Sequence, residues 1–171
     1  TVTPDITLGR RKLKAELIPP ALIVARFFAA EQAALEALEA RAEEAARAVE
    51  ELDEEHGGED GLLFEAKTDK GKLTAKSVKD RTRDIRQDKD AGEERAMLKT
   101  CLSLIEAAAE ADAAVKAAQA ALDAAVVAQY AKLTEGGVKA LLVQDKWLAQ
   151  VRADVAAEVD RVSQALAGRV A

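Results

Sequence analysis

Hydrophobic positions repeat most regularly along two long segments, residues 20–55 and 90–129. Within each segment they recur at intervals of three and four residues, which is typical of a coiled-coil seam on an α-helix. The seam of the first segment consists of Ala21, Phe28, Leu35, Ala42 and Val49 with Val24, Leu38, Ala45 and Leu52. The seam of the second consists of Cys101, Ala108, Val115 and Leu122 with Met97, Leu104, Ala111, Ala118 and Ala125. We therefore expect two long helices paired as an antiparallel hairpin.

The segments around this hairpin predict shorter elements. Residues 5–17 suit a short helix capped by Asp5. Pro19 and Pro20 end it because proline lacks an amide donor and fixes φ. Residues 56–89 open with a glycine-rich loop and continue as a basic connection that contains a short helix. Residues 134–169 suit C-terminal helices, the first capped by Thr134. Together these patterns predict one all-α unit: a coiled-coil-like antiparallel hairpin, short flanking helices and an amphipathic C-terminal helix.

The last helix, which we expect to begin near Asp145 and to end near Arg169, has the strongest apolar face. Its members are separated by 3, 4, 4, 3 and 4 residues and form what we name the C-terminal apolar stripe: Leu148, Val151, Val155, Val159, Val162 and Leu166. Trp147 adds a large aromatic beside it. Such a stripe either closes a small bundle or is an interface for a partner or a second copy, and the sequence favours the two equally.

Composition supports a helical protein and narrows its functions. Alanine fills 39 of the 171 positions while aromatic residues make up 3%, so too few β-branched and aromatic residues remain for a sheet architecture. With 25 basic and 31 acidic residues the net charge is −6, which argues against binding duplex nucleic acid through overall charge. No run of about 18 uncharged apolar residues predicts a membrane span.

Charge is unevenly distributed along the chain. Residues 43–60 hold nine acids and one arginine, whereas residues 67–89 hold nine basic residues and four acids. The favoured interpretation is that the two solvated stretches attract each other across the hairpin tip. The alternative is that the basic segment contacts phosphates. The candidate residues are Lys67, Lys70, Lys72, Lys76, Lys79, Arg81, Arg83 and Arg86.

No catalytic, cofactor-binding or metal-binding constellation is present in the sequence. His56 is the only histidine, so neither a metal-binding histidine pair nor a Ser-His-Asp triad can form. The single Cys101 lies on a seam, where a thiol acts as a small hydrophobe. No phosphate-binding glycine loop occurs. Because the chain opens without Met or a signal peptide and ends directly after a periodic segment, we expect it to be part of a larger protein.

Several local strings resemble one family. They are Ile18-Pro19-Pro20-Ala21-Leu22-Ile23-Val24-Ala25-Arg26-Phe27-Phe28, Glu55-His56-Gly57-Gly58-Glu59, Asp69-Lys70-Gly71-Lys72-Leu73-Thr74, Leu142-Val143-Gln144-Asp145-Lys146-Trp147-Leu148, Glu158, Arg161-Val162-Ser163-Gln164-Ala165-Leu166 and Gly168-Arg169. Over almost its whole length the chain resembles the C-terminal region of the modification (DNA methyltransferase) subunit of type I restriction–modification systems. Asp145-Lys146-Trp147-Leu148 is the most specific block. Gln144 and Gly136-Gly137 depart from the pattern, which has acids there.

The resemblance implies a cytoplasmic adenine-N6 DNA methyltransferase that uses S-adenosylmethionine and meets DNA through a complex with a DNA-specificity subunit and a restriction subunit. The family's cofactor and base-flipping motifs are absent from this chain, so no catalytic residue is carried over. The implied role is non-catalytic assembly, with the helices docking on the specificity subunit. Two alternatives remain: a helical arm that contacts nucleic acid through residues 67–89, and an unrelated dimerising coiled coil.

Overall fold

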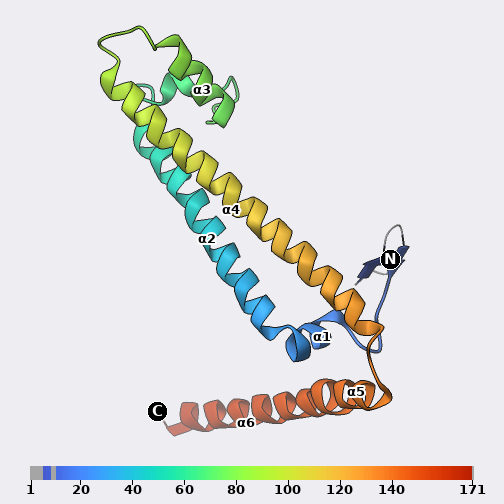
Figure 1. The fold of residues 1–171 in the computed structure, drawn as a ribbon. Coiled ribbons are helices and arrows are strands. Elements are labelled where there is room, and N and C mark those ends of the chain that lie inside the picture. Colours follow the sequence, from blue (N-terminus) through green and yellow to red (C-terminus); the bar gives the residue numbers. More distant parts are fainter. Residues whose placement is uncertain (1–5, 9–10, 171) are drawn as a thin grey trace. The chain divides into compact units, whose positions relative to one another are not determined.

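The structure, a computed structural model, describes residues 6–8 and 11–170, and helices dominate them. The elements follow in the order β1 (Ile6–Leu8), β2 (Arg11–Leu13), α1 (Pro20–Phe27), α2 (Ala29–His56), η1 (Phe64–Ala66), α3 (Ala75–Asp84), α4 (Gly92–Tyr130), α5 (Glu135–Ala140), η2 (Leu141–Leu148) and α6 (Ala149–Val170) (Figure 1). The predicted all-α class is confirmed.

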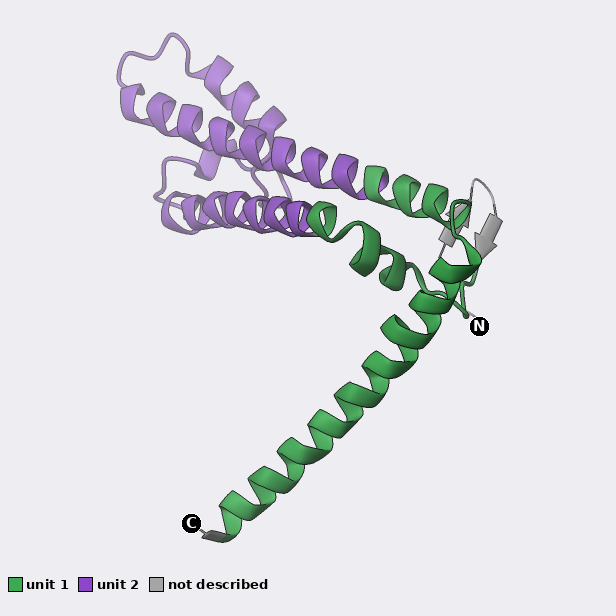
Figure 2. Cartoon of the chain, turned by 60° about the horizontal axis from the view of Figure 1, so that its bottom comes forward, with its two compact units in different colours: residues 1–32, 121–171 green, residues 33–120 purple. Residues whose placement is uncertain are grey.

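The chain divides into two compact units, one made of residues 33–120 and the other of residues 1–32 and 121–171 (Figure 2). Helices α2 and α4 each begin in one unit and end in the other. The unit of residues 33–120 holds most of the hairpin and its tip. The other unit holds α1 and the C-terminal helical segment.

Within residues 33–120, α2 and α4 lie side by side and run in opposite directions (Figures 1 and 2). Every seam position of α2 from Leu35 to Leu52 is buried or half-buried, and so is every seam position of α4 from Met97 to Ala118. The residues between them are mostly exposed. This alternation confirms the predicted heptad register and the antiparallel hairpin. The many alanines on the seam allow the two backbones to approach closely.

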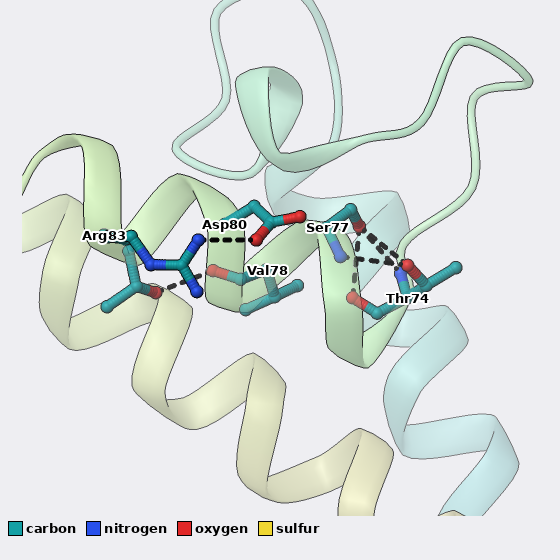
Figure 3. A network of polar contacts seen from close by, with 6 residues as sticks. Thr74, Ser77, Val78, Asp80 and Arg83 are labelled. Atoms are coloured by element: carbon teal, nitrogen blue, oxygen red, sulfur yellow. Dashed lines mark hydrogen bonds and ion pairs between the residues drawn. The ribbon is translucent and has the colours of Figure 1, made fainter.

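The tip of the hairpin contains a compact apolar cluster. It joins η1, α3 and α4 through Leu63, Ala66, Val78, Ile85, Leu98 and Cys101, and Leu52 of α2 packs against it. The helix α3 starts with a capping box, in which the Ser77 amide donates to Thr74 Oγ1 and the Thr74 amide donates to Ser77 Oγ, both at 3.1 Å (Figure 3). The apolar side of α3 then faces the cluster. The short helix predicted in the basic connection is thus confirmed.

The N-terminal helix predicted for residues 5–17 is wrong. The described part of that segment forms a two-stranded antiparallel hairpin in which Ile6 pairs with Leu13 and Leu8 pairs with Arg11. Asp5, the expected cap, lies outside the described residues. The segment carries β-branched residues near a glycine, a composition that favours a short hairpin over a helix.

The single helix predicted for residues 20–55 is also wrong in one respect. It is interrupted at Phe28, whose φ of −133° and ψ of 29° separate α1 from α2. The amide of Phe28 still donates to Val24 O and its carbonyl accepts from Gln32, both at 2.9 Å, so the interruption is confined to one residue. Two consecutive aromatic residues have low helix propensity, and α1 packs against η2, which gives it a tertiary neighbour of its own.

The C-terminal helices predicted for residues 134–169 follow one another directly. Thr134 caps α5 as expected, because its side chain accepts a hydrogen bond from the Gly137 amide. The chain then continues through η2, an eight-residue π-helix, into α6. The predicted start of a separate last helix near Asp145 instead falls inside this π-helical segment.

Candidate interaction surfaces

Polar side chains hold η2 to the N-terminal part of the same unit. Arg26 Nη1 of α1 lies 2.7 Å from Asp145 Oδ2. The ammonium of Lys146 donates to the backbone carbonyls of Glu16 and Leu17, each at 2.9 Å. Leu141 is fully buried at the start of η2. The beginning of the C-terminal helical segment is therefore fixed by several independent contacts.

The C-terminal apolar stripe lies beyond this anchor and is exposed along its whole length. Leu148 and Val162 are each 43% exposed, and the remaining four members are between 56% and 59% exposed. Trp147 is 57% exposed. From residue 149 to residue 169 every side chain of α6 is exposed, so the other described elements of its own unit leave the stripe uncovered. Within that unit the stripe does not close a bundle.

The π-helix η2 contains both the anchoring residues, Asp145 and Lys146, and the first member of the stripe, Leu148. In a π-helix each amide bonds five residues back, which lengthens the turn and changes the direction of the following side chains. Asp145 and Lys146 are half-buried at the anchor, while the next residue, Trp147, is exposed. Val143, which the sequence pattern did not single out, is a further exposed apolar side chain of η2, at 43%. A search for helical periodicity misses it because a π-segment breaks that period.

Half of the candidate phosphate contacts are paired with carboxylates. Lys67 lies 2.7 Å from Asp53, Lys79 lies 2.8 Å from Glu106, Arg81 lies 2.7 Å from Glu94 and Arg83 lies 3.1 Å from Asp80. The hydrogen bond that Arg81 donates to Glu94 raises the pKa of Arg81 against the opposing effect of its burial. The Lys67–Asp53 pair joins the basic stretch to the acidic one, as the favoured interpretation of the charge pattern predicts.

The other candidates are exposed, and within the described residues no carboxylate lies at ion-pairing distance from their side chains. These candidates are Lys70, Lys72, Lys76 and Arg86. Figure 3 shows the paired Arg83 turned toward Asp80 near the end of α3, with the capping contacts of Thr74 and Ser77 at the start of that helix. Taken together, four of the eight candidates are neutralised by carboxylates of the chain and four are not.

Gly57 makes room for the Lys67–Asp53 pair. The residue is buried, and a Cβ atom there would collide with the Asp53 carboxylate, the Asp53 carbonyl oxygen and the Lys67 ammonium. Only glycine can accommodate such a close approach of neighbouring atoms. The Glu55-His56-Gly57-Gly58-Glu59 string therefore has a structural role at the end of α2.

Chemically reactive groups are not gathered at any point of the described chain. Cys101 is fully buried, and burial, assisted by the charge of Asp53, raises the pKa of its thiol. His56 ends α2 as a half-buried side chain near Glu55. Among the described residues, no three of His, Cys, Asp and Glu are grouped so that they could hold a metal ion. None of the helices described has the length and apolar character needed to cross a membrane.

The comparisons with known proteins give no relative. No family model matches the chain, and neither a curated protein nor a solved structure matches it.

Proposed function

We propose that this chain is a non-catalytic helical assembly region of a type I restriction–modification methyltransferase subunit, and that α6 docks on the DNA-specificity subunit. The resemblance of the local strings supports the family. The exposed C-terminal apolar stripe carries the docking role, because its six members lie uncovered at 43–59% exposure. A continuous apolar face of this kind marks an interaction surface.

The residue types of the stripe support a covered state. Valine lowers helix propensity because its side chain loses rotamer freedom in a helix, and its apolar side chain forms no hydrogen bonds with water. Four of the six stripe positions are nevertheless valine, which is expected where a partner covers the helix face. Fully burying one such side chain contributes roughly 1.5–3 kcal/mol. Because η2 is anchored by Arg26, Asp145 and Lys146, a partner would meet a helix whose starting direction is already set.

In the intact enzyme this region would act beside catalytic domains that the chain does not contain. The proposed parent subunit transfers a methyl group from S-adenosylmethionine to adenine N6 in the cytoplasm. It would assemble with the specificity subunit and, for cleavage, with the restriction subunit. No residue of this chain is assigned to the cofactor or to the reacting base. DNA recognition would belong to the partner.

A double substitution tests the docking role. Val155→Glu with Val162→Glu places two carboxylates on the stripe. The matched control, Ala157→Glu with Gln164→Glu, places two carboxylates with the same seven-residue spacing on the opposite, exposed face of α6. Both variants should keep the helicity and melting temperature of the original chain.

In a pull-down with the specificity subunit, the stripe variant should lose binding and the control should keep it. Loss of the fold in the stripe variant would show that the stripe is core. Equal binding by both variants would place the docking surface elsewhere.

A further inference from the structure

We infer that the C-terminal apolar stripe also binds a second copy of this chain, through parallel pairing of two α6 helices, so that the free chain is a dimer with its docking face covered. This inference rests on the proposed function only in treating the stripe as an interface. The identity of the specificity subunit plays no part in it.

The period of the stripe limits which helix can match it. Leu148 and Val159, Val151 and Val162, and Val155 and Leu166 are each separated by 11 residues. An 11-residue repeat corresponds to about 3.67 residues per turn, which favours a slightly right-handed rather than a left-handed supercoil. A heptad partner would drift by about 20° per heptad relative to a straight helix. A second copy has the same sequence and therefore the same hydrophobic period. Its stripe can therefore contact this one along the whole length.

An in-register parallel pair also matches side-chain size layer by layer. Leucine occupies both ends of the stripe and valine occupies the four positions between them. Each residue then faces its own counterpart, so every layer contains two side chains of equal size. A two-fold interface of this kind uses the same patch on both copies.

Charges beside the stripe favour the parallel orientation. Arg152 directly follows Val151 on one flank, whereas Asp154 and Glu158 directly precede Val155 and Val159 on the other flank. In a parallel pair, opposite flanks of the two helices face each other, and the arginine of one copy lies beside the carboxylates of the other. Asp154 is two residues from Arg152, an axial offset of about 3 Å that the long side chain can span.

An antiparallel pair would leave Arg152 without a carboxylate in the other copy. Alignment of Leu148 with Leu166 of the other copy puts residue 157 at the centre of the overlap. Each flank would then face itself, so Arg152 would lie beside the uncharged Ala156 and Ser163. The acidic flank also carries Arg161, which already bonds Glu158 within its own helix. The loss of the Arg152 contacts disfavours the antiparallel form.

The available area suits a weak, reversible dimer. The stripe offers six apolar side chains per copy, with Trp147 beside them, whereas a standard-size interface has roughly 20–30 residues a side. The pair therefore lies at the lower end of specific protein interfaces. Because one face cannot hold two partners, binding of the specificity subunit must displace the second copy. Self-association would thus keep the face covered before assembly.

Sedimentation equilibrium of the purified chain tests the dimer. The chain should show a concentration-dependent dimer, Val155→Glu with Val162→Glu should be monomeric, and Ala157→Glu with Gln164→Glu should dimerise as the original does. Both variants should retain the helical circular dichroism of the original. A monomer at every concentration, or dimers unaffected by the stripe variant, would overturn the inference.

Disulfide trapping tests the orientation. A chain with Val155→Cys should form a covalent dimer on oxidation, because residue 155 faces its counterpart in a parallel pair. The original chain, whose Cys101 is fully buried, serves as the control and should stay uncrosslinked. Crosslinks confined to a mixture of Leu148→Cys and Leu166→Cys chains would contradict the parallel pairing.

A dimer that fails to bind the specificity subunit would refute the proposed function alone, and a docking-competent monomer would refute this inference alone.

Discussion

The ammonium of Lys67 lies 2.7 Å from a carboxylate oxygen of Asp53, and this ion pair ties the loop after η1 to the end of α2. The two side chains are 20% and 33% exposed, so water screens the pair only in part. The contact connects the basic and acidic stretches of the sequence across the hairpin tip. Attraction within the chain therefore accounts for part of the uneven charge distribution.

Removal of this pair should destabilise the tip. Lys67→Met keeps the apolar stem of the side chain but leaves the half-buried Asp53 carboxylate without its ammonium, and we expect a loss of about 1–3 kcal/mol in the free energy of unfolding. Lys79→Met is the control, because the Lys79–Glu106 pair is more than half exposed and should contribute below about 1 kcal/mol. Urea unfolding followed by circular dichroism measures both. Equal losses would mean that the partial burial of the Lys67 pair has no energetic effect.

A methyl group at Gly57 should also destabilise the tip. The Cβ of Gly57→Ala would displace the Asp53 carboxylate or the Lys67 ammonium, and overpacking of this kind costs about 1–3 kcal/mol. Gly58→Ala offers a matched control, since no atom lies within 4 Å of the position its Cβ would take. Thermal unfolding of the two variants compares them directly. If Gly58→Ala were the more damaging change, the packing described around Gly57 would be incorrect.

The periodic elements could be predicted from the sequence, and the elements set by tertiary contacts could not. Heptads identified the α2 and α4 seams because burial on a helix face follows the helical period. The π-helix of η2 depends on Asp145 and Lys146 meeting α1 and residues 16–17, which lie more than 100 positions away. The interruption at Phe28 leaves the hydrophobic period intact, so no pattern reveals it. The sequence predicted the C-terminal apolar stripe but could not predict whether it is buried or exposed, because a helix face in a core and one in an interface have the same hydrophobic spacing.

Cys101 should be unreactive in the folded chain. Its thiol is fully buried and its pKa is raised, so little thiolate forms at pH 8. A disulfide reagent such as DTNB should label it at least tenfold more slowly in buffer than in urea. Because the folded-state pKa lies above the ordinary value of 9.0, the thiol adds no pH dependence below that value, and its contribution to stability is lost as the pH rises through the raised pKa. Equal labelling rates in buffer and urea would contradict the burial.

The isolated chain should neither bind S-adenosylmethionine nor methylate DNA. It contains no glycine-rich loop of the kind that binds such a cofactor. Calorimetric titration with S-adenosylmethionine should give no saturable heat up to millimolar concentration. Saturable binding at micromolar concentration would reveal a cofactor site on these helices and would require a catalytic role for them.

The Asp145-Lys146-Trp147 block should separate into stabilising and docking residues. Lys146 donates to the carbonyls of Glu16 and Leu17, and hydrogen bonds from a charged donor contribute about 1.5–3 kcal/mol. Lys146→Met should therefore lower the melting temperature and increase hydrogen exchange around residues 14–18. Lys139→Met, which removes only an exposed pair with Glu135, should leave both unchanged.

Trp147→Ala in the same block should show the opposite behaviour. The indole is 57% exposed, so its removal should change the melting temperature little and should weaken binding to the specificity subunit. A stabilising role for Trp147 would require closer contacts with the described chain than its exposure allows. If Trp147→Ala unfolded the chain while Lys146→Met did not, the assignment of anchor and surface within η2 would be reversed.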